Sequence, residues 1–254
     1  MFRPRVIPVL LLRNLGLVKS IKFKDFRYIG DPINAVKIFN DLHADELVFL
    51  DITASKEKRK ISLDFVRKVG DECNMPFAVG GGIRTIEDIR EILNSGAEKV
   101  VINTAAAEKP DFIRQASEEF GSSTIVVSMD VKKKFLGDNT VWTYSGSKAT
   151  IYDPVTYAKL VAEKGTGEII IQSIDHDGMM EGFDMDLISK ISNSVTIPVV
   201  ACSGAGSYQH LRQAVKEANA SAVAAGSLFV YHGARRAVLV NYPSPEELSK
   251  MFVF

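Results

Sequence analysis

Carboxylates stand at the ends of several short apolar segments of this sequence. Asp51 and Asp130 each close one such segment, and Asp177 lies just beyond a third. A charged side chain rarely ends a buried strand unless it faces a site, and an aspartate surrounded by apolar residues can have a raised pKa and exchange protons with a substrate. We therefore interpret Asp130 as a catalytic acid or base and Asp51 as a substrate contact. The alternative for both is an acceptor that only organises its own loop.

Glycine-rich turns follow two other apolar segments. Residues 80–82 are three glycines before a stretch with helical spacing, and residues 203–206 read SGAG in the matching place. Residues without a Cβ let backbone N–H groups approach an anion at a helix N-terminus, so each turn suits a phosphate. A single turn of this kind is usually only a tight turn. Two of them, each followed by a polar strand end at residues 103–104 or 226–227, predict a ligand with a phosphate at each end.

The elements that position these groups follow from the hydrophobic pattern. Short β-rich apolar segments recur about every 20 to 45 residues, each followed by a loop and by apolar residues at helical spacing. Apolar strands that alternate with amphipathic helices predict a parallel sheet covered by helices, and eight units in 254 residues fit a single (β/α)8 TIM barrel. An open doubly wound sheet is the alternative. The expected strands are 5–11, 46–51, 76–80, 99–103, 124–130, 168–173, 197–202 and 222–226.

An internal repeat favours the barrel. Residues 76–85 align with residues 198–207, and Glu46 aligns with Glu168 at the same offset of 122 residues. Such self-similarity indicates a two-fold repeat of half-barrels, each with four βα units.

The chain has no obvious internal boundary. No linker rich in proline or serine and no block of charge divides it, so we expect residues 1–254 to form one domain. After Phe229 no clear amphipathic pattern continues where the eighth helix belongs. Residues 230–254 are therefore an atypical C-terminal segment, and the outer wall beside the eighth strand is the least defined part of the prediction.

Four charged residues fall at or just before the starts of four expected strands. Arg5, Glu46, Lys99 and Glu168 belong to strands one, two, four and six, and their charges alternate in sign. Since the starts of parallel strands meet at one end of a barrel, these side chains would converge on the barrel axis. We interpret them as a ring of salt bridges that plugs or gates the bottom of the barrel. Separate solvated ion pairs are the alternative.

Composition excludes several classes of function. The 31 basic and 31 acidic residues cancel, so the chain lacks the positive field on which nonspecific nucleic-acid binding relies. No apolar run reaches the roughly 18 residues that span a bilayer, and no cleavable signal sequence is visible, so we expect a cytoplasmic protein without a membrane partner. Cys73 and Cys202 stand far apart without metal-ligand spacing, and we predict neither a metal nor another cofactor.

Several motifs resemble one enzyme family. Residues 46–55 (ELVFLDITAS), 79–83 (VGGGI), 99–105 (KVVINTA) and 143–146 (TYSG) are similar to the cyclase subunit of imidazole glycerol phosphate synthase, with similarity from about residue 3 to residue 229. The resemblance implies a barrel with a glutaminase subunit docked at its N-terminal face. It also implies that ammonia travels up the barrel to a bisphosphorylated substrate, which is split and cyclised to imidazole glycerol phosphate and an aminoimidazole carboxamide ribotide.

The resemblance also implies roles for individual residues of this sequence. The resemblance equates the four charged residues at the strand starts with the family's ammonia gate. It equates Asp130 with the second of two catalytic aspartates, and Lys19 with a lysine of the loop after strand one. We add the loop after the sixth strand to the phosphate contacts. The expected phosphate contacts are Gly82, Asn103, Thr104, Asp177, Gly178, Gly204, Gly226 and Ser227, with Lys19 and Asp51 as further substrate or loop residues.

One position departs from the family pattern. The family has an aspartate at the end of strand one, as the acid–base partner of the residue equivalent to Asp130, where this chain has Leu11. A leucine cannot transfer a proton, and loss of one member of such a pair commonly costs ~10²- to 10⁴-fold in rate. We therefore expect ring closure to be slow or absent unless another carboxylate substitutes.

Two functions besides the family reaction stay open. A gate without the acid–base partner resembles the paralogous branch found with surface-polysaccharide genes, whose members work with their own glutaminase and pass ammonia to a sugar amidotransferase in lipopolysaccharide biosynthesis. On this hypothesis the barrel is a conduit. A phosphosugar isomerase of the related half-barrel type also fits two phosphate sites and an aspartate, but the gate charges would be idle in it.

Overall fold

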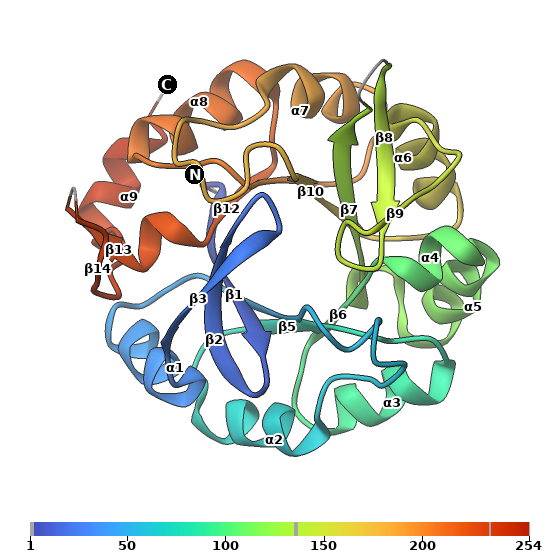
Figure 1. The fold of residues 1–254 in the computed structure, drawn as a ribbon, viewed down its shortest axis with the longest axis horizontal. Helices are drawn as coiled ribbons and strands as arrows, with labels where there is room; N and C mark the ends of the chain where they lie inside the picture. The colour runs from blue at the N-terminus through green and yellow to red at the C-terminus, as the bar shows by residue number, and fades with distance from the viewer. Residues whose placement is uncertain (1–2, 135–136, 234, 254) are drawn as a thin grey trace.

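Eight parallel strands close into a barrel at the centre of the molecule (Figure 1). The structure is a computed structural model, and it describes residues 3–134, 137–233 and 235–253. Strands pair in the order β1, β4, β5, β6, β7, β10, β11, β12, and β12 pairs with β1 to close the barrel. The predicted (β/α)8 fold is therefore confirmed. The barrel strands are β1 (Arg5–Arg13), β4 (Leu47–Asp51), β5 (Phe77–Gly80), β6 (Lys99–Ile102), β7 (Ile125–Lys133), β10 (Glu168–Ser173), β11 (Val199–Cys202) and β12 (Ala222–Ala225).

The barrel strands lie where the apolar segments predicted them, and most of their ends differ by no more than two residues. β7 runs three residues beyond its expected end, and β1 runs two. Each pairs there with an antiparallel strand that the hydrophobic pattern did not predict, β8 (Asn139–Thr143) for β7 and β2 (Gly16–Ile21) for β1. These additional ladder hydrogen bonds keep the two strands extended past the rim of the barrel.

Helices cover the outside of the barrel, as α3 illustrates. Thr85 caps the helix by accepting from the backbone N–H of Asp88, whose carboxylate accepts in return from the N–H of Thr85. Ile89 and Ile92 are buried. No helix within the described ranges is long and apolar enough to cross a membrane. The helices are α1 (Pro32–Asp41), α2 (Leu63–Glu72), α3 (Ile86–Asn94), α4 (Thr104–Glu108), α5 (Asp111–Phe120), α6 (Pro154–Glu163), α7 (Met185–Ser192), α8 (Tyr208–Ala218) and α9 (Pro245–Met251).

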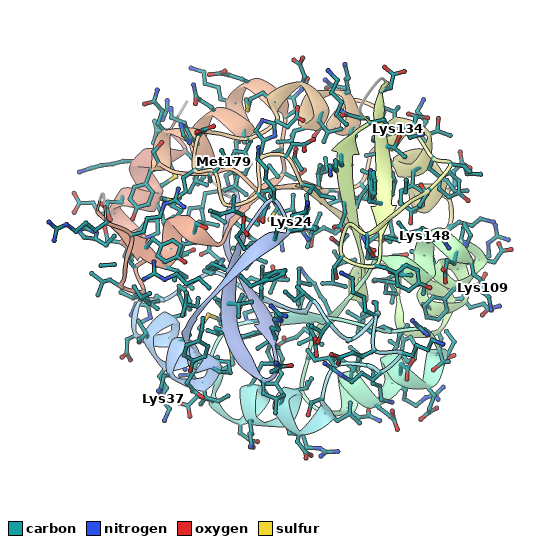
Figure 2. The ribbon with its side chains drawn as sticks, viewed as in Figure 1. Lys24, Lys37, Lys109, Lys134, Lys148 and Met179 are labelled. Carbon is teal, nitrogen blue, oxygen red and sulfur yellow. The ribbon has the colours of Figure 1, made fainter. Side chains whose placement is uncertain are left out.

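Hairpins extend from the barrel. β2 pairs with β3 (Lys24–Gly30), and in Figure 1 this hairpin crosses the middle of the view. Figure 2 accordingly places Lys24 near the middle and Lys37 and Lys109 toward the helical rim. The other small strands are β9 (Lys148–Ala149), which pairs with β8, and β13 (Tyr231–His232) with β14 (Ala237–Val238).

The C-terminal segment completes the outer wall beside β12. It begins with the β13–β14 hairpin and ends with α9, on which Leu248 and Met251 are buried. Between them lies Tyr242, whose ring packs against Phe39 and Phe229. The sequence shows no amphipathic pattern here because α9 starts late and has only seven residues, too few for a visible repeat.

Two apolar layers hold the barrel. Side chains alternate along each strand, so one set packs against the helices and the other fills the barrel interior. The outer layer joins every helix to the sheet in one continuous cluster. The inner layer consists of Ile7, Val9, Val48, Ala78, Val101, Val126, Ile170, Val200, Cys202, Ala222 and Ala224, with Leu11 and Leu50 partly buried against it.

Candidate functional site

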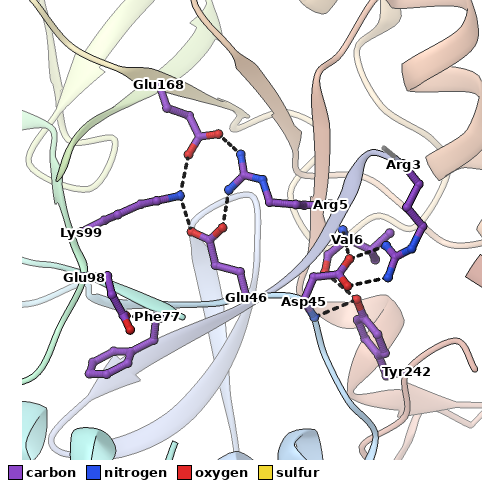
Figure 3. Close-up of polar contacts among 10 residues, drawn as sticks. All are labelled: Arg3, Arg5, Val6, Asp45, Glu46, Phe77, Glu98, Lys99, Glu168 and Tyr242. Carbon is purple, nitrogen blue, oxygen red and sulfur yellow. Dashed lines mark hydrogen bonds and ion pairs between the residues drawn. The ribbon is translucent and has the colours of Figure 1, made fainter. Parts of the chain in front are cut away.

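The four charged residues at the strand starts form a closed ring (Figure 3). Arg5 donates to both Glu46 and Glu168. Lys99 Nζ lies 2.9 Å from Glu46 Oε1 and 3.4 Å from Glu168 Oε2. Both glutamates are buried, and although burial opposes the charge of the guanidinium, Glu168 and Glu46 raise the pKa of Arg5. The expected convergence is therefore present, and separate solvated pairs are excluded.

Every second residue of a barrel strand points inward, so inward side chains form columns that run from this ring to the opposite end of the barrel. From Arg5, the inward residues of β1 are Ile7 and Val9, and Leu11 follows at the far end. From Glu168, the inward residue of β10 is Ile170, and Gln172 follows at the far end. Each column therefore runs from a charge at the bottom through apolar side chains to the mouth.

Two adjoining cavities open at the C-terminal ends of the barrel strands. Leu11, Ser20 and Gln172 line both, so these residues stand at the boundary. The structure thus brings all the expected mouth residues together in two groups. The first cavity contains Asp51, Gly82, Asn103, Thr104 and Asp130, and the second contains Lys19, Asp177, Gly178, Gly204, Gly226 and Ser227.

Close approach of neighbouring atoms explains why glycine occupies key positions in these turns. Gly82 has φ +68°, and a Cβ there would lie 1.8 Å from the carbonyl oxygen of Arg59. At Gly226 a Cβ would lie 2.4 Å from Lys19 Nζ. Gly226 therefore leaves room for the lysine amine in the second cavity.

Asp130 has the environment of a proton donor or acceptor. It is 5% exposed, and within the described ranges no hydrogen bond to its carboxyl group is formed. Burial, reinforced by the charge of Asp177, raises the pKa of Asp130 to about 8. The side chain therefore carries a proton at neutral pH and faces the first cavity, where it can donate that proton to a ligand.

Leu11 lies on the wall shared by both cavities. Its neighbours are Leu50 on β4 and Val18 on β2. The carboxylates that line the two cavities are Asp51, Asp130 and Asp177. A substitute for the aspartate that the resemblance leads us to expect at position 11 would have to come from Asp51 or Asp177, and both have partners.

The carboxylate of Asp51 is bound within its own loop. One oxygen lies 2.5 Å from Arg59 Nη1, and the other accepts from the backbone N–H groups of Thr53 at 3.1 Å and Ala54 at 3.2 Å. These contacts leave little capacity for proton transfer. They favour the loop-organising alternative over a direct chemical role for Asp51.

Asp177 holds the β2–β3 hairpin over the mouth. Its carboxylate accepts from Ser20 Oγ at 2.6 Å and from the backbone N–H of Phe23 at 3.2 Å, and its carbonyl oxygen accepts from Lys22. Burial raises the pKa of Asp177, while these hydrogen bonds and Lys19 oppose the increase. This geometry favours a hairpin-holding role for the Asp177 side chain over a phosphate contact, because a carboxylate repels a phosphate.

Lys19 reaches from the hairpin into the second cavity. It is 4% exposed, and its Nζ donates to the carbonyl oxygen of Val9 at 2.6 Å. Burial lowers the pKa of Lys19 to about 8, and Asp177 acts against that decrease. Since Gly204, Gly226 and Ser227 line the same cavity, this ammonium group is placed to bind a phosphate.

Sequence reasoning missed several polar residues of the mouth, among them Gln172, Ser128 and Arg84. Gln172 donates through Nε2 to Ser128 Oγ at 3.1 Å and pairs in register with Asp130. Arg84 lines the first cavity two residues after Gly82. Gln172 and Ser128 could have been found from their positions, since each directly follows three apolar residues of a buried strand.

We also examined the described residues for groups that could bind a metal ion. Across the residues that the structure describes, no three His, Cys, Asp or Glu side chains gather closely enough to hold a metal ion. Cys202 lines the second cavity, and burial raises the pKa of its thiol to about 12. That thiol stays protonated and unreactive at neutral pH.

Comparison with known proteins identifies the family. Residues 5–235 match the family described as "Histidine biosynthesis protein". The chain is 46% identical over 248 residues to "Putative imidazole glycerol phosphate synthase subunit hisF2" of Pseudomonas aeruginosa, covering 98% of this chain and 99% of that protein. It is 44% identical over 232 residues to "Imidazole glycerol phosphate synthase subunit HisF" of Alkaliphilus metalliredigens, covering 91% and 92%. This chain belongs to the HisF family.

HisF membership confirms the resemblance drawn from the motifs. It makes this chain a homologue of the cyclase subunit of imidazole glycerol phosphate synthase, a lyase. A "hisF3" protein of Vibrio vulnificus, named "Putative imidazole glycerol phosphate synthase subunit", is 44% identical over 251 residues, 98% of this chain and 96% of that protein.

Proposed function

We propose that this chain is the ammonia-using subunit of a glutamine amidotransferase complex of the imidazole glycerol phosphate synthase type. The observation that carries the proposal is the closed ring of Arg5, Glu46, Lys99 and Glu168 beneath an apolar barrel interior that leads to the cavity with Asp130. Ammonia is small and neutral, so an apolar interior suits it better than any ion. A charged ring at the opening excludes free passage until a partner rearranges it.

The partner that we propose is a glutaminase subunit at the N-terminal face of the barrel. Two observations support this partner. The relatives are named as subunits of a synthase, and the Arg5 side chain is 34% exposed, so the ring is accessible from that face. The glutaminase would release ammonia directly beneath the ring.

The substrate that we propose spans the two cavities. A bisphosphorylated ribulosyl aminoimidazole carboxamide substrate would bind one phosphate at Gly82, Asn103 and Thr104 and the other beside Lys19. Asp130, protonated at neutral pH, would be the remaining acid or base for its cleavage and cyclisation to imidazole glycerol phosphate and the ribotide. Because Leu11 cannot transfer a proton, we expect this reaction to run about 10²- to 10⁴-fold below that of a relative with aspartate there.

A second candidate is a conduit that supplies ammonia to a sugar amidotransferase in lipopolysaccharide biosynthesis. The observation that favours it is Leu11 together with Asp51 and Asp177, since both of these cavity carboxylates are already bound to other groups. The chain would then not form the imidazole ring of the product. Ammonia would leave the mouth of the barrel for the active site of another protein.

The test combines the chain with the glutaminase of its own organism, glutamine and the bisphosphorylated substrate, and follows glutamate and imidazole glycerol phosphate by mass spectrometry. We expect a stable complex, glutamate formation and slow product formation. In the variant Lys99→Met the glutamine-driven rate should fall further than the rate driven by added ammonium. If the glutaminase does not bind and the substrate has no affinity, the proposal is wrong; if both bind but only an added sugar amidotransferase consumes the ammonia, the second candidate replaces the first.

A further inference from the structure

A tyrosine from the C-terminal segment lies beside the charged ring at the bottom of the barrel (Figure 3). Tyr242 is 6% exposed, and its hydroxyl donates to the carbonyl oxygen of Val6 at 2.8 Å. The same hydroxyl oxygen accepts from the backbone N–H of Asp45 at 3.2 Å. One side chain thus joins the backbone next to Arg5 with the backbone next to Glu46.

A second contact ties the same two segments together. The Asp45 carboxylate accepts from the backbone N–H of Val6 at 2.9 Å and from both terminal nitrogens of Arg3 at 2.6 Å. The side chains of Tyr242 and Asp45 therefore both link Val6 to Asp45. None of the atoms in these links belongs to the four charged residues of the ring. Burial raises the pKa of Tyr242, so its hydroxyl keeps its proton and remains a donor.

We propose that Tyr242 is a positioning residue for the ring, so that the C-terminal segment determines how tightly the ring closes. Arg5 must hold Glu46 and Glu168 with two nitrogens of one planar group, and that geometry depends on where the start of β1 lies relative to the residue before β4. Tyr242 and Asp45 fix that relation. The consequence of this positioning for ammonia transfer rests on the function proposed above.

The competing explanation is that Tyr242 only fills the apolar core. Its ring lies 5.5 Å from that of Phe229 and 6.5 Å from that of Phe39. The variant Tyr242→Phe keeps these contacts between aromatic rings and removes only the hydroxyl. It therefore separates positioning from packing, and Tyr231→Phe, on the same segment but without a hydrogen bond from its hydroxyl among the described residues, is the matched control.

The first experiment measures amide hydrogen exchange on the full chain. Loss of the two hydrogen bonds that the Tyr242 hydroxyl makes should speed exchange at least about 5-fold in Tyr242→Phe. We expect the increase only in residues 5–7 and 44–47, and none in Tyr231→Phe. A uniform increase over the whole chain would assign Tyr242 to general stability, and no increase would also overturn the proposal.

The second experiment uses the complex with the glutaminase and compares the glutamine-driven rate with the ammonium-driven rate. We expect the ratio of the two rates to fall at least about 3-fold in Tyr242→Phe and to stay unchanged in Tyr231→Phe. An unchanged ratio despite faster local exchange would refute a positioning role. A wild-type complex without any glutamine-driven reaction would instead refute the proposed function, and the exchange result would stand independently.

Discussion

Restoring a carboxylate at position 11 is the sharpest perturbation of this protein. Leu11 and Asp130 line the same cavity, and Asp130 holds its proton up to about pH 8. In Leu11→Asp the new side chain is acidic enough to be ionised at neutral pH, so the cavity would contain one protonated and one ionised carboxyl group. Those are the two states that an acid–base pair requires.

The size of the effect follows from the role of such a pair. Recovery of one general acid or base is worth about 10²- to 10⁴-fold in rate. At about 1.4 kcal/mol per factor of ten, this corresponds to a barrier lower by about 3 to 5 kcal/mol. Because Leu11 is only partly buried against the inner layer, its loss should cost about 1 to 2 kcal/mol of stability, a decrease in Tm of roughly 2 to 8 °C.

The assay supplies the bisphosphorylated substrate and saturating ammonium at neutral pH, below the pKa of Asp130, and follows imidazole glycerol phosphate. Leu11→Asn is the matched control, because it has the shape of aspartate and the same stability cost but cannot transfer a proton. We expect a gain in kcat for Leu11→Asp alone. If Leu11→Asp binds the substrate with unchanged affinity and turns over no faster than Leu11→Asn, then position 11 does not limit the reaction and the reasoning fails.

Three further predictions test the site by stability and ligand binding. The folded protein keeps the proton of Asp130 until about pH 8, whereas the unfolded chain loses it near pH 4, so wild-type stability should fall between these values. Asp130→Asn should remove that fall in urea titrations. Arg5→Met leaves two buried glutamates facing Lys99 and should lower the free energy of unfolding by about 3 kcal/mol. Adding Glu168→Gln to the Arg5→Met protein should restore part of that stability. Lys19→Met should weaken inorganic phosphate binding, and wild-type affinity should decrease above pH 8 as the amine loses its charge.

Each of these predictions has an outcome that contradicts it. Equal pH profiles for wild type and Asp130→Asn would place the Asp130 carboxyl in contact with water. If Glu168→Gln destabilises the Arg5→Met protein further, the ring is not a balanced set of charges. Calorimetry that finds the same phosphate affinity for Lys19→Met would remove the amine from the second cavity's binding site.

The barrel and its ring could be predicted because both depend on pattern within single segments. The middle residues of a barrel strand such as residues 168–173 must be apolar, because they are buried. The first residue of that strand must lie at the bottom of the barrel. Glu168 therefore faces the axis whatever surrounds it. The same logic applies to Arg5 and Lys99, since parallel strands all begin at one end.

The β2–β3 hairpin could not be predicted in the same way. All residues from Lys24 to Tyr28 are exposed, so no alternation of apolar and polar residues marks the strand. The hairpin is held instead by β1 and by Asp177, which is 157 residues from Ser20 in the sequence. A local pattern has no access to such a contact.

The sequence by itself determined a (β/α)8 barrel, the charged residues at its bottom and the glycine-rich turns and aspartates at its mouth, because periodicity and strand ends specify which side chains face the axis. Only the tertiary structure decided what those side chains can do. Asp51 is bound by Arg59, Asp130 is left without a hydrogen-bond partner among the described residues, and Tyr242 reaches Val6 across 236 positions. Proton affinity and positioning depend on burial and on partners that are distant in the chain, and these exist only once the barrel has closed.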